Sequence, residues 1–170
     1  MNGSIYEREL LHILAGDEKY LRSYNRKLKN WDKDMQMLMD KPFFVTRSAG
    51  SLKADLIAIR YNVSLVVEVK SSSKPSIVFS EASGQRQDQA ERLTKSCEKA
   101  GLFITYAFRL KNPEGDPWRM FSMPGNPLGT AMVLHQILPR ASVTRDGYYG
   151  LKWESGLALS DFIRWINRLS

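Results

Sequence analysis

The sequence is poor in cysteine and histidine. Its 170 residues include one cysteine, Cys97, which excludes an internal disulfide and a thiolate metal cluster and fits a reducing compartment. His12 and His135 have no second histidine or cysteine at metal-ligand spacing, so we expect both to be packed or surface residues. The sequence also lacks a glycine-rich phosphate loop, a Gly-x-Ser-x-Gly motif and internal repeats. These absences argue against zinc, nucleotide-loop and serine-nucleophile chemistry.

Long apolar runs are missing as well. No stretch approaches the length of a membrane span, and no N-terminal apolar run resembles a signal peptide. We therefore expect a soluble cytoplasmic protein with no membrane partner and no small-molecule organic cofactor. With 43% hydrophobic residues, the chain can bury one full core, and we expect a single domain over residues 1–170.

Acidic residues are fewer than basic ones. The sequence has 18 aspartates and glutamates and 25 lysines and arginines, which gives a formal net charge of +7. A basic protein favours a polyanionic partner, but this charge alone does not separate DNA from RNA or from a requirement for solubility.

The few acidic residues include two in an informative stretch over residues 47–71. Residues 43–46, 54–59 and 64–69 are rich in strand-forming side chains, and residues 60–62 are typical of a turn. The last two strands should therefore form a hairpin that carries two carboxylates and a lysine.

The hairpin brings Asp55, at the start of one strand, beside the end of its antiparallel partner. Residues two apart in a strand share a face, so Glu68 and Lys70 lie together while Val69 points to the other face. Two carboxylates can bind a hard divalent cation, the Val69 carbonyl can add a ligand, and Lys70 can orient or help deprotonate an attacking water. This set predicts metal-dependent phosphodiester hydrolysis, with Mg²⁺ as the default metal and Mn²⁺ as a substitute. The alternative is a surface hairpin that ends in a salt bridge.

Four motifs then occur in the order typical of the archaeal Holliday junction resolvase family, which the sequence resembles. They are Glu-Arg-Glu-Leu at 7–10, Arg-Ser-Ala-Gly-Ser at 47–51, Asp-Leu-Ile-Ala at 55–58 and Glu-Val-Lys at 68–70. The resemblance covers nearly the whole chain and departs at residues 17–42 and 124–140. It implies an α/β, restriction-endonuclease-like fold with a mixed central β-sheet flanked by helices.

The resemblance also implies roles for particular residues. The implied metal ligands are Glu7, Asp55, Glu68 and the Val69 carbonyl, the further catalytic residues are Lys70 and Ser51, and the DNA contacts are Arg8, Arg47, Ser51 and Gln89. For Gln89, the alternative is an ordinary polar surface residue.

Glu7 also stands out by its spacing. Residues 5–15 are typical of a helix, and Glu7 lies four residues before Leu11 and seven before Leu14, on the face that points to the core. A carboxylate there is costly unless it meets a cation. The alternative is that Glu7 caps or solvates the first turn.

Residues 17–40 are predicted to form one long inserted helix with Asp17 as its N-cap. Its apolar stripe comprises Tyr20, Tyr24, Leu28, Trp31, Met35 and Leu38, and its basic face comprises Arg22, Arg26, Lys27, Lys29 and Lys33. We expect the stripe to be buried, in this subunit or across a dimer interface. The basic face is either solvated or follows a phosphate backbone.

The rest of the chain supplies the remaining elements. We expect a polar loop at 71–76, strands at 77–79, 102–108 and 118–123, an edge strand at 148–153, and helices at 81–100, 131–138 and 159–169, the last capped by Ser160.

Together these features predict a Mg²⁺-dependent DNA endonuclease that cleaves four-way junctions in recombination and repair. A junction has near two-fold symmetry and is cut on two strands, which predicts a homodimer. Three alternatives stay open. They are another nuclease of the same fold acting on duplex or other branched DNA, a non-catalytic DNA-binding relative, and a structural or RNA-binding protein. The second is disfavoured because both Asp55 and Lys70 are present.

Overall fold

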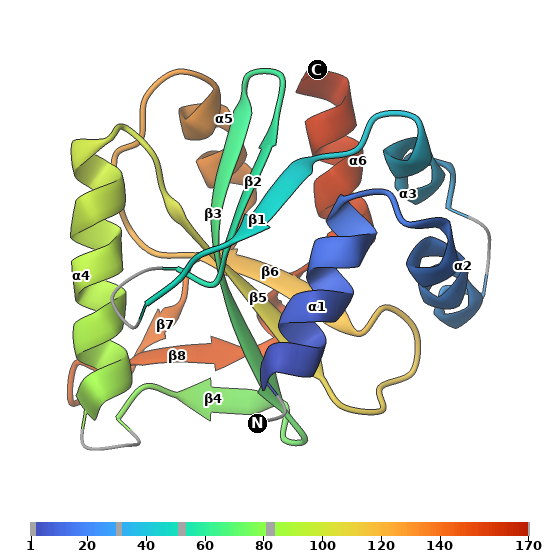
Figure 1. Cartoon of the computed structure of the whole chain (residues 1–170). Coiled ribbons are helices and arrows are strands. Elements are labelled where there is room, and N and C mark those ends of the chain that lie inside the picture. Colours follow the sequence, from blue (N-terminus) through green and yellow to red (C-terminus); the bar gives the residue numbers. More distant parts are fainter. Residues whose placement is uncertain (1–2, 30–31, 51–53, 81–83, 170) are drawn as a thin grey trace.

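The computed structural model of the protein describes residues 3–29, 32–50, 54–80 and 84–169. Its centre is a six-stranded sheet in the order β1-β2-β3-β5-β6-β9 (Figure 1). The strands are β1 Phe44–Arg47, β2 Leu56–Arg60, β3 Val63–Ser72, β5 Ile104–Leu110, β6 Trp118–Ser122 and β9 Leu157–Ala158. β3 and β5 run parallel, whereas the other neighbouring pairs are antiparallel. The predicted mixed central sheet is therefore confirmed.

Helices and a small sheet cover the two faces of the central sheet. The helices on one face include α1 Gly3–Leu14, α5 Thr130–Ile137 and α6 Leu159–Leu169, and the other face carries α4 Gln85–Lys99 with a sheet of β4 Ser76–Val78, β8 Tyr149–Lys152 and β7 Ser142–Val143 (Figure 1). Residues 148–153 were predicted to be an edge strand, but β8 lies between β4 and β7. Within the described ranges, no helix combines the length and the apolar character that crossing a membrane requires.

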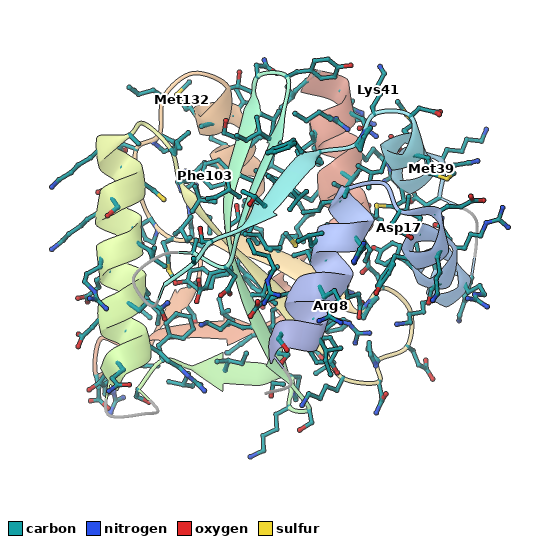
Figure 2. The ribbon with its side chains drawn as sticks, viewed as in Figure 1. Arg8, Asp17, Met39, Lys41, Phe103 and Met132 are labelled. Atoms are coloured by element: carbon teal, nitrogen blue, oxygen red, sulfur yellow. The ribbon has the colours of Figure 1, made fainter. Side chains whose placement is uncertain are left out.

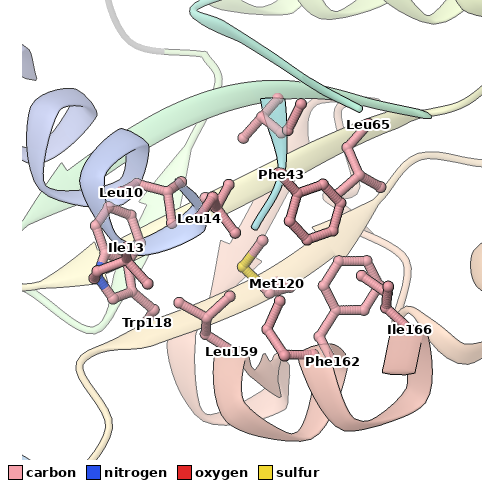
Figure 3. Packing of buried hydrophobic residues seen from close by; sticks show 14 of the residues in the cluster. Leu10, Ile13, Leu14, Phe43, Leu65, Trp118, Met120, Leu159, Phe162 and Ile166 are labelled. Carbon is pink, nitrogen blue, oxygen red and sulfur yellow. The ribbon is translucent and has the colours of Figure 1, made fainter. Parts of the chain in front are cut away.

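The α1 helix is fixed to the sheet by its apolar stripe. Leu10, Ile13 and Leu14 are at most 2% exposed and pack in one cluster with Trp118 of β6 and Phe162 of α6 (Figure 3). Full burial of each such side chain contributes about 1.5–3 kcal/mol. This packing fixes α1, and with it Glu7, relative to the strands.

The prediction of one helix over residues 17–40 is wrong. Asp17 does cap α2 Glu18–Lys27 by accepting a hydrogen bond from the Tyr20 N–H at 3.3 Å. The helix stops there, because Lys29 has a left-handed φ of 59°, and Asp32 starts a new helix by accepting from the Met35 N–H at 3.0 Å. The second helix, α3 Lys33–Gln36, continues into the 3-10 turn η1 Met37–Met39.

The two short helices still bury most of the predicted stripe. Tyr24, Met35 and Leu38 are at most 2% exposed, and Leu28 is partly buried against the same core. Trp31 lies outside the described residues. The five predicted basic residues on the other face are all exposed.

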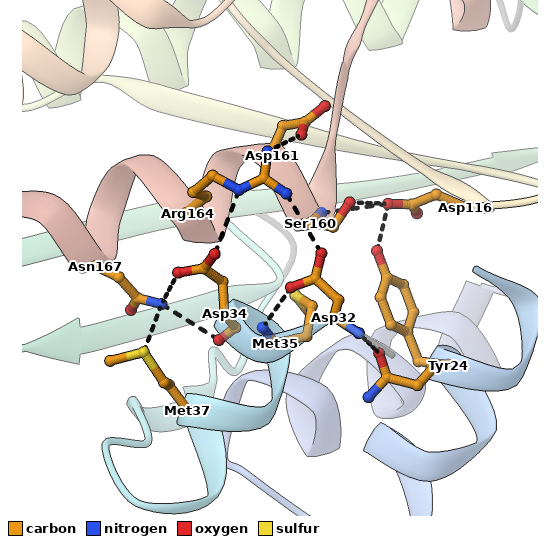
Figure 4. Close-up of polar contacts among 11 residues, drawn as sticks. Tyr24, Asp32, Asp34, Met35, Met37, Asp116, Ser160, Asp161, Arg164 and Asn167 are labelled. Atoms are coloured by element: carbon orange, nitrogen blue, oxygen red, sulfur yellow. Dashed lines mark hydrogen bonds and ion pairs between the residues drawn. The ribbon is translucent and has the colours of Figure 1, made fainter. Parts of the chain in front are cut away.

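Polar contacts attach this segment to α6. Arg164 pairs with Asp34 at 3.3 Å and with Asp161 at 3.0 Å, and Asn167 donates to Asp34 at 3.1 Å (Figure 4). Ser160 does not cap α6 as predicted. It lies inside the helix, and its hydroxyl donates to buried Asp116 at 3.1 Å.

Two further differences and one agreement concern single residues. Ser71 and Ser72 belong to β3, although a loop was predicted, because they pair with Arg109 and Leu110 of β5. His135 is 4% exposed and its Nε2 lies 2.8 Å from the Met123 carbonyl oxygen, which confirms it as a packed residue.

Candidate active site

The β2–β3 hairpin brings the three predicted polar residues together. Leu56 pairs with Val67, so Asp55, directly before β2, comes opposite Glu68. The carboxylate of Asp55 accepts a hydrogen bond from the Val69 N–H at 2.7 Å, and the Lys70 ammonium donates to Glu68 at 3.0 Å. The shared face of Glu68 and Lys70, predicted from strand alternation, is confirmed.

Glu68 is almost completely buried, with 3% of its surface exposed. Its Oε1 accepts from Lys70, but its Oε2 has no hydrogen-bond partner among the described residues. A buried carboxylate oxygen without a partner is costly. Glu68 therefore has an unused acceptor that can serve a bound cation.

The acidity of Asp55 is shifted by the same surroundings. Burial, and after it the charge of Glu68, raise the pKa of Asp55, whereas the Val69 N–H and Lys70 lower it, and the net result is a pKa of about 6. Two carboxylates in one partly buried site are stabilised by a divalent cation or by a proton.

The donor set fits a hard divalent cation. The N–H and C=O groups of one strand residue point to the same edge, so the Val69 carbonyl lies on the side of Asp55 that its N–H contacts. Two carboxylates and a carbonyl offer oxygen ligands, which Mg²⁺ prefers. No three His, Cys, Asp or Glu side chains in the described ranges form a group that could hold a metal, so Glu7 is not gathered with Asp55 and Glu68.

Glu7 lies at the border of this site. Its side chain is 19% exposed and its Oε2 accepts from the Arg47 guanidinium at 2.7 Å. Its charge contributes to the raised pKa of Asp55, so Glu7 acts on the same region of the protein. Glu7 does meet a cation, as its spacing required, but that cation is Arg47. Metal binding by Glu7 and phosphate binding by Arg47 stay predictions.

Within the described part of the chain, neither Arg8 nor Gln89 forms a hydrogen bond or ion pair with the two carboxylates. Arg8 is exposed on α1 (Figure 2), and Gln89 is half-buried on α4, one turn beyond Arg86. Ser51 lies outside the described residues. The DNA contacts of all three stay predictions.

Two polar residues of the core and of α1 were missed by sequence reasoning. Glu9 accepts from Arg109 of β5 at 3.0 Å and from the Trp118 indole of β6 at 3.1 Å, so this second glutamate of the motif attaches α1 to the sheet. Tyr106 is buried beside Glu68 in the paired strand, and burial raises its pKa. Glu9 lies two residues after Glu7, and this helical spacing could have predicted that the two glutamates lie on different faces of the helix. Tyr106 gave no such signal, because it lies within an apolar run.

This architecture is the restriction-endonuclease-like fold, in which a mixed sheet is flanked by helices. One solved structure that it resembles is that of Hjc, a Holliday junction resolvase from the archaeal hyperthermophile Archaeoglobus fulgidus. The TM-score is 0.54 and the identity 18%, over 96% of this chain and 97% of the resolvase chain. No family model and no curated protein sequence matches this chain. The likeness shows the fold, and membership of the resolvase family stays a prediction.

Proposed function

We propose that the protein is a Mg²⁺-dependent DNA endonuclease that cleaves four-way junctions in recombination and repair. One observation carries the proposal above the others. Asp55, Glu68 and Lys70 meet in a partly buried site, and one oxygen of Glu68 has no hydrogen-bond partner among the described residues. The fold shared with a Holliday junction resolvase supports a nuclease of this kind.

Each residue has a definite task in this proposal. Asp55, Glu68 and the Val69 carbonyl would hold the metal, which when bound polarises the phosphate and lowers the pKa of water. Lys70 is held by Glu68 at 3.0 Å, so its ammonium is fixed in direction and can orient the attacking water or stabilise charge on the phosphate. The Val69 N–H keeps the Asp55 carboxylate in place.

A homodimer would provide one such site for each of two opposing strands of a junction. Recognition would then depend on branched shape, through phosphates contacted by basic residues of two subunits. If each dimer neutralises about six to ten phosphates, affinity should fall by roughly 10³ to 10⁵ between 50 and 200 mM salt.

The test compares a four-way junction with its component duplexes, in Mg²⁺, in Mn²⁺ and in chelator, with the mass of the protein determined in solution. We expect a dimer that cuts the junction in either metal and cuts duplex far more slowly. Equal cleavage of junction and duplex, or a monomer, would instead indicate another endonuclease of this fold. Metal-independent binding without any cleavage would indicate a non-catalytic DNA-binding protein.

A further inference from the structure

A polar pocket lies beside the candidate active site. It has a volume of about 270 Å³ and begins at Lys70, which therefore borders both. Its other cations are Lys74, from the turn after β3, and Arg86, from the first turn of α4. Four serines between residues 71 and 76 supply hydroxyl groups, and no carboxylate among the described residues lines it.

The walls of this pocket are held by regular structure. Ser71 and Ser72 pair with β5, and the Ser72 hydroxyl accepts from the Lys74 N–H at 3.0 Å, which closes the turn. On the far side, Ser76 pairs with Lys152 of β8, and the Pro75 carbonyl accepts from the Trp153 N–H at 2.8 Å. Strand pairing therefore fixes the backbone of Ser71, Ser72 and Ser76, and the Ser72–Lys74 hydrogen bond closes the turn between them.

The chemistry of the lining selects a phosphate group. Three cations and four hydroxyls can all donate hydrogen bonds to an anion with several oxygens. Among the described residues of the lining, none is an aromatic side chain on which a base could stack, and the apolar residue Ile77 is buried. At about 30 Å³ per water, the volume equals roughly nine waters, which is room for a phosphate with some hydration.

We propose that this pocket binds a backbone phosphate of the DNA strand that is cut, close along the strand to the scissile phosphate. The proposal rests on the proposed function, because Lys70 must serve both sites. The pocket would fix the direction in which the cut DNA strand continues beyond Asp55 and Glu68. This gives the segment 71–76 a task beyond connecting β3 to β4.

The test uses the double variant Lys74→Gln/Arg86→Gln, which replaces the two cations of the pocket other than Lys70. We expect junction affinity in Mg²⁺ or Ca²⁺ to fall about tenfold to hundredfold and the dependence on salt to weaken by about one to two phosphates. The matched control is Lys41→Gln with Arg145→Gln, which removes the same charge from exposed positions elsewhere. An equal loss in the control would overturn the proposal, because net charge alone would explain it.

A second measurement locates the phosphate. Junctions with one neutral methylphosphonate, placed in turn at each position near the cut, are bound by wild type and by the double variant. At one position the methylphosphonate should weaken wild-type binding by the same factor as the double variant, without weakening the variant further. If no position behaves in this way, the proposal is wrong, while cleavage by wild type would leave the proposed function intact.

A third measurement distinguishes binding of a DNA phosphate from binding of free inorganic phosphate. Inorganic phosphate that raises the Tm of wild type, but not of the double variant, would show an anion site. Without a methylphosphonate effect, that result would overturn the DNA assignment in favour of free phosphate. If wild type cleaves no DNA in any metal, the proposed function fails, and the assignment of the pocket to a cut strand fails with it.

Discussion

Asp116 and Glu68 are both deeply buried carboxylates, with 7% and 3% of their surface exposed, but their hydrogen bonding differs. Asp116 accepts from the Tyr24 hydroxyl, from the Trp118 N–H at 3.0 Å, and from both the N–H and the hydroxyl of Ser160 (Figure 4). Glu68 accepts from Lys70, and no described residue donates a hydrogen bond to its second oxygen. Burial is therefore common to both carboxylates, and an unused acceptor marks the candidate site.

The pKa values of Asp116 and Asp55 reflect the same difference in surroundings. Burial raises the pKa of Asp116, but its hydrogen bonds from Tyr24, Trp118 and Ser160 all act to lower it. Burial also raises the pKa of Asp55, and there Glu68 adds to the effect. Asp116 is surrounded by hydrogen-bond donors and connects α2, β6 and α6, whereas the adjacent carboxylates Asp55 and Glu68 are stabilised by a cation or by a proton. Substitutions can test this distinction.

The largest expected effect is on catalysis. Asp55→Asn keeps the size of the side chain and an acceptor for the Val69 N–H, but it removes one negative charge from the proposed metal site. We expect junction cleavage to fall by about 10³-fold or more, as the loss of several kcal/mol of transition-state stabilisation would produce. Junction affinity should stay close to wild type. The control is Asp146→Asn, at an exposed turn. Loss of binding in parallel with cleavage would contradict this division of roles.

The next effect is on stability. Asp116→Ala leaves the donors of Tyr24, Trp118 and Ser160 buried without an acceptor. We expect the free energy of unfolding, measured with urea, to fall by about 3 kcal/mol. Cleavage per folded molecule should be unchanged at low temperature. Glu114→Ala, exposed in the same loop, serves as the control. A cleavage defect without a stability defect would place Asp116 in the catalytic machinery.

A smaller effect concerns pH. The pKa of Asp55 is about 6 in the folded protein and about 4 in an unfolded chain, so the folded state binds more protons between these values. In metal-free protein, the stabilisation is complete below pH 4 and is lost as pH rises through 6. We expect a loss of about 1–2 kcal/mol from this group, after allowance for solvent screening.

Asp55→Asn should lack this part of the pH dependence. Mg²⁺ at pH 7 should raise the Tm of wild type and have little effect on the variant. An equal Mg²⁺ response in both proteins would show that the metal binds elsewhere.

The smallest effect is expected on the exposed basic face of the α2–α3 segment. Replacing Arg26, Lys29 and Lys33 together by Glu should change junction affinity by less than about threefold at low salt, because we regard this segment as scaffold. Lys74→Gln with Arg86→Gln provides the comparison, because these residues line the pocket that we propose to bind DNA. A drop of tenfold or more would show that the inserted segment follows the phosphate backbone.

The sequence by itself determined the local part of the site. Strand alternation is a property of the backbone, so it correctly placed Glu68 and Lys70 on one face and Val69 on the other. The turn at residues 60–62 was enough to bring Asp55 opposite Glu68, because a short hairpin fixes the register of its strands. Most strands and helices followed from periodicity, whereas the mixed sheet was implied by the resemblance to the resolvase family.

Contacts between distant segments decided the rest. The 17–40 helix breaks at Lys29, and its two parts are attached by Tyr24 to Asp116 and by Asp34 to Arg164, more than 90 residues away. Helical periodicity is satisfied equally by one long helix or by two short ones, so it could not predict the break. Likewise, whether a described residue donates to the second oxygen of Glu68 depends on which groups the tertiary structure brings near it, and no local sequence pattern specifies this.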